Sequence, residues 1–486
     1  MKKQAFNPYL PEWEYIPDGE PRVFGDRVYI FGSHDKFGEM QFCQNDYVSW
    51  SAPLNDLANW TYGGVTYKKT QDPRNRDGKY FMEAPDVVEY KGEYYLFYSL
   101  SFLSSVAVAK AKNPEGPFEY YGLVHHKDGR TLGEGEDKHP FDPAVFIDDD
   151  GEIYLYSGSA PLEKNDTRNL GSEVMKLEPD MLTIKEEPKD LIVSVKNSAG
   201  TGFEGHEFYE ASSMRKINGK YYFIYSSVVS YELCYAVSDY PDKGFVYGGV
   251  IVNLGDIGIN GRTEALNPLG NTHGSLIEIN GQWYIFYHRQ TNRTFFARQA
   301  CAERVEIKNG KIAQVEVTSC GLNGKPLLGV GEYPARISCV LVGPDGKNDY
   351  NISEDMARDY LHGFSSPLTD GWIENTKTLP YLTQDEPDGE GTTQYIKHFL
   401  NGACAGYRYF SFEKSGTISV VTRGTGKGKF AVCTELGGKA IAEISVTPHE
   451  GWTKSQAVAL PVKGTHALYF RYEGEGETDF LKFILE

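Results

Sequence analysis

The sequence predicts an all-β protein in which a five-bladed β-propeller is followed by a β-sandwich of the jelly-roll type. Three observations support this fold class: a composition rich in aromatic residues and glycine, a short phrase that recurs five times, and a final run of short alternating strands. Aromatic residues make up 14% of the 486 residues, beside 52 glycines and 24 prolines. Such a mixture favours short twisted strands with tight turns over helical bundles.

The recurring phrase is a short apolar strand, a turn with a glycine, and an aromatic strand. Each copy has the pattern of a β-hairpin, and the rest of each period has room for two more strands. One copy therefore predicts one four-stranded antiparallel blade, and we expect a propeller domain over residues 1–318. A long sandwich or a stack of unrelated hairpins is the alternative. The copies lie at 23–33, 89–99, 148–158, 216–226 and 278–288, with turn glycines Gly25, Gly92, Gly151, Gly219 and Gly281.

The last third of the chain has a different pattern. The hairpin phrase stops near residue 320, and we expect residues 319–352 to hold a linker and the start of the second domain. Short alternating strands then follow one another at about ten-residue spacing, which is typical of a sandwich. We expect this β-sandwich domain to span residues 353–486.

One position in the repeat carries acidic side chains. It lies nine residues before the turn glycine, or seven in the first copy, whose hairpin is two residues shorter. Because side chains alternate between the two faces of a strand, positions of equal parity share a face. If this strand is the innermost one of each blade, these side chains converge on the propeller axis. The residues at or beside this position are Asp18, Glu83, Asp142, Glu210 and His273.

Convergent carboxylates indicate a chemical use. Carboxylates that lie close together repel one another, and burying them costs several kcal/mol. Cleavage of a glycosidic bond needs a pair of carboxyl groups, one kept protonated and one ionised by different surroundings. A third acid can raise the pKa of the protonated one by like-charge repulsion. Any one of these acids taken alone is equally well explained as a solvated turn residue.

Charge and cysteine content exclude several classes of partner. The 49 Lys and Arg residues and 67 Asp and Glu residues give a net charge of −18, so neither nucleic acid nor a membrane surface is an expected partner. Seven cysteines are scattered without a C-x-x-C pair, and the first residues contain no apolar stretch typical of a signal peptide. We therefore expect a cytoplasmic protein with reduced thiols.

Four segments together resemble glycoside hydrolase family 43, a family of inverting enzymes with a five-bladed propeller: IPDGEPRVFGDRVYIFGSHD, FDPAVFIDDDGEIYLYSGS, FYEASSMRKINGKYYFIYSS and NTHGSLIEINGQWYIFYHR. The resemblance implies that Asp18 is the general base and Glu210 the general acid. It implies that Asp142 orients the general acid and tunes its pKa. It further implies that His273 lies near a calcium or other cation in the central channel, that Arg298 lies near the pocket, and that no organic cofactor is needed.

The resemblance leaves alternatives at two positions. Glu204 and Glu207 are rivals for the acid role, although neither lies nine residues before the glycine. Glu83 stands where the family usually has Trp or Tyr before Ala-Pro, so we expect it to contact substrate. At the end of the chain, the strand order resembles a family 6 carbohydrate-binding module, and Trp452 stands where such modules often place an aromatic ring for stacking on sugar. This second domain either binds carbohydrate or is a structural buttress.

The expected function is that of an inverting glycoside hydrolase acting on an oligosaccharide or polysaccharide. We expect it to release a terminal pentose, L-arabinofuranose or D-xylose, from oligosaccharides derived from plant hemicellulose, such as arabinoxylan fragments. Related activities of the same family are the alternatives, namely β-D-xylosidase, endo-arabinanase and galactofuranosidase. A propeller that binds sugar without cleaving it, or one that serves only as an interaction platform, is the alternative from another class.

Overall fold

The computed structural model describes residues 3–39, 41–159, 171–348, 379–386, 389 and 391–486. The expected domain boundary at residues 352–353 lies outside these described residues. In the described ranges the helices are 3₁₀ turns of three residues, and none could span a bilayer. Strands dominate, and they form a propeller and a sandwich, which confirms the predicted all-β fold class.

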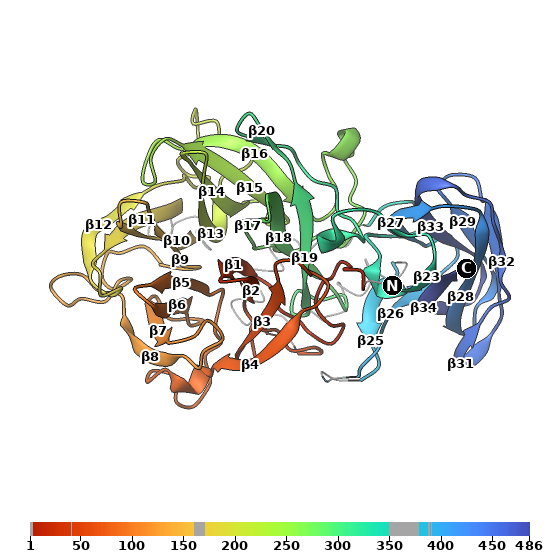
Figure 1. Ribbon diagram of the computed structural model, residues 1–486, viewed down its shortest axis with the longest axis horizontal. Helices are drawn as coiled ribbons and strands as arrows, with labels where there is room; N and C mark the ends of the chain where they lie inside the picture. Colours follow the sequence, from red (N-terminus) through yellow and green to blue (C-terminus); the bar gives the residue numbers. More distant parts are fainter. Residues whose placement is uncertain (1–2, 40, 160–170, 349–378, 387–388, 390) are drawn as a thin grey trace.

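The propeller consists of five antiparallel sheets whose strands pair in chain order. Figure 1 shows the first strand of each sheet facing the centre of the ring. Blades one and two are β1 (Glu20–Phe24), β2 (Arg27–Phe31), β3 (Tyr47–Pro53), β4 (Thr61–Tyr67), and β5 (Asp86–Tyr90), β6 (Glu93–Ser99), β7 (Val106–Ala111), β8 (Glu119–Leu123). Blades three and four are β9 (Ala144–Ile147), β10 (Ile153–Ser159), β11 (Gly171–Leu177), β12 (Ile184–Asp190), and β13 (Phe208–Ile217), β14 (Lys220–Ser227), β15 (Glu232–Ser238), β16 (Val246–Asn253).

The fifth blade differs from the expected four strands. Its described sheet has three, β17 (Leu276–Ile279), β18 (Gln282–Gln290) and β19 (Arg298–Val305). The N-terminal segment lies beside β19, where the Tyr9 N–H donates to the Ala300 carbonyl at 3.2 Å and the Asn7 side chain bonds both backbone groups of Ala302. Contacts between the start of the chain and the last blade thus close the ring.

The second domain is a sandwich of two sheets. One sheet contains β22 (Leu327–Leu328), β24 (Val340–Val342), β27 (Cys404–Phe412), β29 (Lys427–Cys433), β30 (Ala442–Val446) and β33 (Gly464–Glu475). The other contains β23 (Gly331–Pro334), β25 (Tyr381–Gln384), β26 (Gln394–Phe399), β28 (Gly416–Gly424), β31 (His449–Lys454), β32 (Val458–Leu460) and β34 (Thr478–Leu485). Strands β22 to β24 lie in the stretch 319–352, where we expected a linker and the start of the second domain, and they pair with strands of the sandwich sheets.

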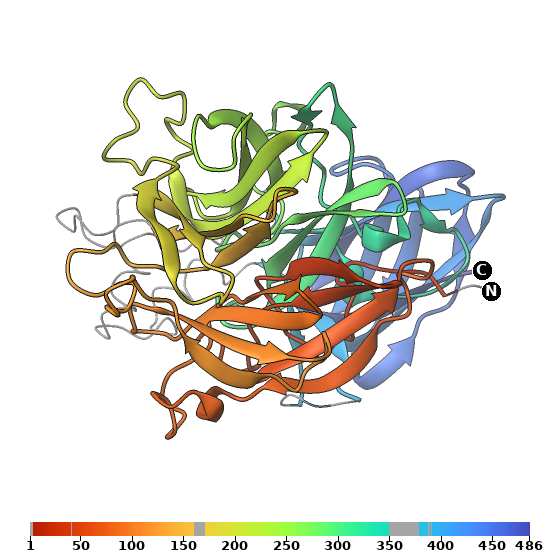
Figure 2. The ribbon, with the colours of Figure 1, turned by 60° about the vertical axis from the view of Figure 1, so that its left-hand side comes forward.

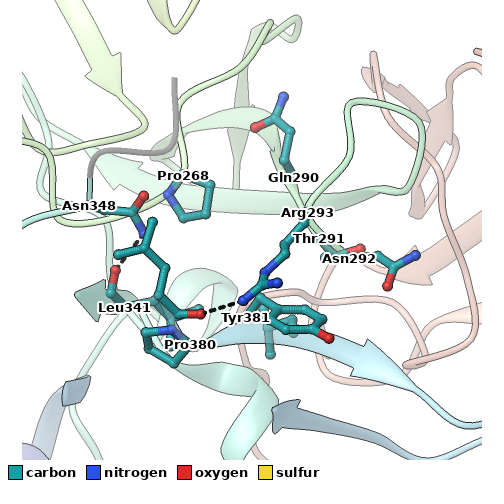
Figure 3. A pocket seen from close by; sticks show the side chains of 11 residues that line it. Pro268, Gln290, Thr291, Asn292, Arg293, Leu341, Asn348, Pro380 and Tyr381 are labelled. Carbon is teal, nitrogen blue, oxygen red and sulfur yellow. Dashed lines mark hydrogen bonds between the residues drawn. The ribbon is translucent and has the colours of Figure 1, made fainter. Parts of the chain in front are cut away.

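The sandwich lies beside the propeller and not over its centre (Figures 1 and 2). The buried Arg408 guanidinium on β27 pairs with the buried carboxylate of Asp256, which follows β16. The Asn292 N–H on the propeller donates to the Leu382 carbonyl on β25 at 2.8 Å. A small pocket lies next to this contact, and there the Arg293 guanidinium lies 4.0 Å from the centre of the Tyr381 ring (Figure 3).

Candidate active site

The innermost strands bring the predicted acids to one end of the propeller axis. Asp18 and Asp142 come two residues before β1 and β9, and Glu210 lies near the start of β13. Asp18, Asp142 and His273 are buried, whereas Glu83 and Glu210 are partly exposed. The charges of Asp18 and Asp142 both raise the pKa of the Glu210 carboxyl, so the three groups influence one another electrostatically.

The backbone is unusual at this ring of residues. Asp18 and Asp142 have positive φ angles of 57° and 48°, and Ala211, directly after Glu210, has one of 71°. Residues other than glycine rarely adopt this left-handed conformation, which costs about 1–3 kcal/mol and clusters at functional sites. A left-handed residue thus occurs just before β1 and β9, at the acids themselves, and inside β13, at the residue after Glu210.

A β-bulge places Glu210. Ser213 pairs with Ile224 and Glu210 pairs with Ser226, so three steps along β13 match two along β14. The extra residue bends the strand and re-aims the side chains before it, as bulges commonly do. Counting back from the turn glycine finds Glu210, but the bulge decides which way its side chain points.

Asp18 is held by an arginine and a neutral histidine. The Arg298 Nη1 donates to Asp18 Oδ1 at 3.0 Å, and the Asp18 N–H donates to His288 Nδ1 at 3.1 Å. Burial lowers the pKa of His288 to about 3, so its ring is neutral and can accept this bond. Burial raises the pKa of Asp18, but the Arg298 charge together with smaller contributions from His288, His273 and Ser33 outweighs burial, and the pKa lies below its ordinary value. Asp18 is therefore ionised at neutral pH.

Arg298 is itself fixed by Asp35. Its Nε and Nη2 donate to the two oxygens of Asp35 at 2.8 and 2.9 Å, a bidentate arrangement that determines the orientation of the guanidinium. Sequence reasoning selected Arg298 but missed Asp35 and His288. Asp35 ends the first family-like segment and His288 lies in the last one, so their place in those segments was a signal for both.

Glu210 has the opposite protonation state to Asp18. Burial, followed by the negative charge of Asp142, raises the pKa of Glu210 to about 8. Asp142 Oδ2 accepts the Ala211 N–H at 3.0 Å and lies 3.4 Å from His273 Nδ1. Burial lowers the pKa of His273, but the charge and hydrogen bond of Asp142, together with the charges of Asp18 and Glu20, outweigh burial and the pKa rises to about 9. At neutral pH, Glu210 therefore holds a proton while His273 is a cation.

A comparison with family models adds to this geometry. Residues 17–312 match the model of glycosyl hydrolases family 43, which covers more than half of the chain and contains the acids described above. The chain belongs to glycoside hydrolase family 43. It is accordingly a glycosidase, and the prediction of this family from the sequence is confirmed.

Individual family 43 proteins resemble it over different lengths. A "Xylosidase/arabinosidase" from Thermoclostridium stercorarium is 47% identical and covers 100% of this chain and 99% of its own. A "Beta-xylosidase" from Xylanibacter ruminicola is 33% identical over 58% of this chain and 89% of its own. The solved structure of RS223-Beta-xylosidase is 27% identical, has a TM-score of 0.51, and covers 65% of this chain and 99% of its own.

Glu83 is influenced by the same charged groups, because the charges of Asp142, Arg298 and Asp18 all act on its carboxyl. The Cys43 thiol donates to Glu83 Oε2 at 3.1 Å, and the Tyr47 hydroxyl donates to the Glu83 carbonyl. Burial raises the pKa of Glu83 to about 8. Glu83, which we expect to contact substrate, is therefore a carboxylic acid that is neutral at pH 7.

Glu204 and Glu207, the two alternatives for the general acid, form hydrogen bonds within the loop before β13. Glu207 is buried and accepts the Ser198 hydroxyl at 2.7 Å and the Gly205 N–H at 3.0 Å. Glu204 is exposed and accepts the Gly200 N–H. Both carboxylates are occupied with backbone and side-chain donors of their own loop, which favours Glu210 for the acid role.

Trp452 lies on β31 in the sandwich, apart from the propeller site. The Arg423 guanidinium lies 4.3 Å from the centre of its ring, and the Tyr395 ring packs against it at 5.2 Å. One face of the indole is therefore already covered by a cation, which leaves less of the ring for stacking on sugar.

In the part of the chain that the structure describes, the surroundings of His273 contain too few suitable ligands for a calcium ion that the protein alone would hold. Calcium takes six to eight oxygen ligands. Within the described ranges His273 belongs to no group of three His, Cys, Asp or Glu side chains close enough to share an ion. Its Nδ1 also faces Asp142 as a protonated partner. The residues do not fit a protein-built calcium site, so no catalytic step is assigned to a metal.

Proposed function

We propose that this family 43 enzyme is an inverting exo-glycosidase that removes terminal L-arabinofuranose or D-xylose from oligosaccharides derived from plant hemicellulose, such as arabinoxylan fragments. The observation that carries the proposal is the opposite protonation of two neighbouring carboxyl groups. Asp18 has a lowered pKa and Glu210 has a pKa raised to about 8. Pairs of titratable groups whose surroundings push their pKa values apart take the base and acid roles in glycosidases.

The mechanism assigns a proton to each group. Asp18 takes a proton from a water molecule as that water attacks the anomeric carbon. Glu210 gives its proton to the departing glycosidic oxygen on the other side of the sugar. Attack on the face opposite the leaving group inverts the anomeric centre. Asp142 orients the Ala211 backbone beside Glu210 and keeps Glu210 protonated through its negative charge.

The proposal that the released sugar is a pentose is supported by the names of two similar proteins. The relative that matches the full length carries the name xylosidase/arabinosidase, and a second relative is named a β-xylosidase. Both names describe release of a single pentose. Endo-arabinanase and galactofuranosidase activities are the outcomes that would redirect the proposal within the family.

The test is a panel of nitrophenyl glycosides. We expect wild-type protein to release nitrophenol from the α-L-arabinofuranoside or the β-D-xyloside faster than from the galactofuranoside. On an oligosaccharide, whose departing sugar oxygen needs a proton, Glu210→Ala and Asp18→Asn should each lower kcat/KM by about 10²- to 10⁴-fold. The exposed Glu204 offers a matched control, because Glu204→Ala removes a carboxylate from the neighbouring loop and should leave the rate within about twofold. Equal rates for wild type and Glu210→Ala would overturn the assignment.

Three further expectations belong to the proposal. The sandwich, whose strand order resembles a family 6 carbohydrate-binding module, would bind carbohydrate through Trp452, which a pull-down on insoluble arabinoxylan with Trp452→Ala tests. A calcium ion near His273 would take most of its ligands from water, and EGTA treatment followed by a thermal melt tests this. Location in the cytoplasm stays a prediction that cell fractionation tests.

A further inference from the structure

Blade four carries a second cluster of chemically active side chains. His206 lies in the loop before β13, and Glu232 and Cys234 lie at the start of β15 (Figure 1). Their ligand atoms lie within 4.8 Å of one another. His206 Nδ1 is 2.6 Å from Glu232 Oε1, and Cys234 Sγ is 3.5 Å from that oxygen and 4.0 Å from the His206 nitrogen. None of these groups takes part in the proposed reaction.

The donor set is that of a borderline-soft metal ion. Imidazole nitrogen, carboxylate oxygen and thiolate sulfur are the three donors that zinc accepts in proteins, whereas calcium and magnesium prefer oxygen alone. Around a tetrahedral zinc ion these atoms would lie roughly 3.3–3.6 Å from one another, given metal–ligand distances of about 2.0–2.3 Å. The observed separations of 2.6, 3.5 and 4.0 Å bracket these values. Small side-chain movements therefore suffice to admit an ion.

Surrounding residues hold the donors in place. The Ser227 hydroxyl donates to Glu232 Oε1 at 2.7 Å. The His206 ring stacks on Tyr247 with a centroid distance of 4.9 Å and an interplanar angle of 10°. Such outer contacts orient metal ligands in known sites, and their loss typically weakens metal binding about 10- to 100-fold. The cluster is thus a supported arrangement and not a chance meeting of mobile side chains.

We propose that His206, Glu232 and Cys234 form a binding site for one divalent ion of the zinc class. The His206 side chain is 35% exposed and Glu232 is buried, so the ion would enter from the His206 side and keep one position open to water. Binding replaces the hydrogen bond between His206 and Glu232, and the Cys234 thiol proton and any proton on His206 Nδ1 pass to solvent. The thiolate, imidazole and carboxylate then bind the ion directly.

The site has a structural consequence for the catalytic strand. His206 precedes Glu210 by four residues, and Glu207 between them is buried. A bound ion would connect the loop before β13 to β15 through three ligands. In the described structure, the His206 side chain makes this connection through its hydrogen bond to Glu232 and its longer contact with Cys234. We expect the bound ion to stabilise the entry into the strand that carries Glu210.

Cobalt(II) is the probe that tests the site, because sulfur ligation gives it a charge-transfer band in the near ultraviolet and a tetrahedral site gives strong visible bands. We expect the full-length protein, after treatment with a chelator and a thiol reductant, to bind one Co²⁺ with both signatures. Zinc should displace the cobalt and abolish the bands. Cys234→Ser should remove the charge-transfer band, and His206→Gln should weaken Co²⁺ binding at least tenfold.

Matched controls separate this site from others. Cys433→Ser changes another buried cysteine, in the sandwich, and should keep the full spectrum. Ser227→Ala leaves the three ligands intact and should weaken Co²⁺ binding by about 10- to 100-fold. Protein that shows no sulfur band with Co²⁺, or a band that persists in Cys234→Ser, would overturn the proposal. If Cys234→Ser does not fold, His206→Gln decides the question, because unchanged Co²⁺ affinity in that variant also overturns it.

Discussion

The Arg298 guanidinium donates a hydrogen bond to the Asp18 carboxylate at 3.0 Å, and both side chains are buried. A carboxylate removed from water without such a partner would take up a proton instead of staying ionised. The pairing therefore does more than hold Asp18 in place. It determines the protonation state in which Asp18 can act as a base.

Replacing Arg298 should move the acid limb of the activity profile. Without the Arg298 charge, burial dominates, so the pKa of Asp18 rises from its present lowered value and the base is lost at higher pH. Arg298→Met should shift the acid limb of kcat/KM upward by about one pH unit or more. It should also lower the free energy of unfolding by about 3–5 kcal/mol, because Asp18 and Asp35 become uncompensated buried charges. The exposed Arg304 on the same strand is the control, and an Arg304→Met variant with the same shift would contradict this explanation.

The alkaline limb should follow the Glu210 proton. With its pKa raised to about 8, Glu210 is protonated below that pH and loses its proton above it, so kcat/KM should decline above about pH 8. Asp142→Asn removes the like charge and should move this limb to lower pH. His273→Gln removes a positive charge and should move the limb to higher pH. Profiles of kcat/KM for the two variants that shift in the same direction would show that the electrostatic explanation is wrong.

Glu83 and Glu210 should respond differently to the same substitution. Both have a pKa raised to about 8, so electrostatics alone does not separate them. If Glu83 only donates a hydrogen bond to substrate, Glu83→Gln keeps a neutral donor and should change kcat/KM by less than about tenfold. Glu210→Gln removes the transferable proton and should cost about 10²- to 10⁴-fold. Steady-state kinetics on an oligosaccharide, whose departing sugar oxygen needs a proton, compares them, and a collapse in Glu83→Gln alone would move the acid role to Glu83.

The buried ion pair between the domains should make their stabilities interdependent. Arg408→Met leaves the buried Asp256 carboxylate with no charged partner, and we expect unfolding to become easier by about 3–5 kcal/mol. Arg471→Met on neighbouring β33 breaks only a partly exposed pair with Glu473 and should cost less than about 1 kcal/mol. Urea unfolding followed by tryptophan fluorescence measures both. Equal losses in the two variants would mean that the pair adds nothing specific to the domain contact.

Local patterns made the blades and the acids predictable. A hairpin depends on residues a few positions apart, so the turn glycines and aromatic strands identified all five inner hairpins. Parity along a strand is also local, and it brought out Asp18, Glu83, Asp142 and Glu210 as equivalent positions, among which the family resemblance assigned the roles. The bulge before Ser213 was beyond this reasoning, because it depends on how β13 pairs with β14 and not on the residues of β13 alone.

The sequence by itself determined the repeat and the all-β fold class, and it indicated which acids are candidates for the site, since each of these signals lies in neighbouring residues. Only the tertiary structure decided the states of these acids. Arg298 lies 280 residues from Asp18 and 263 from Asp35, and Asp142 reaches the Ala211 backbone in the next blade. A carboxyl group takes its pKa from its burial and from the charges around it, and ring closure brings those charges together from distant parts of the chain.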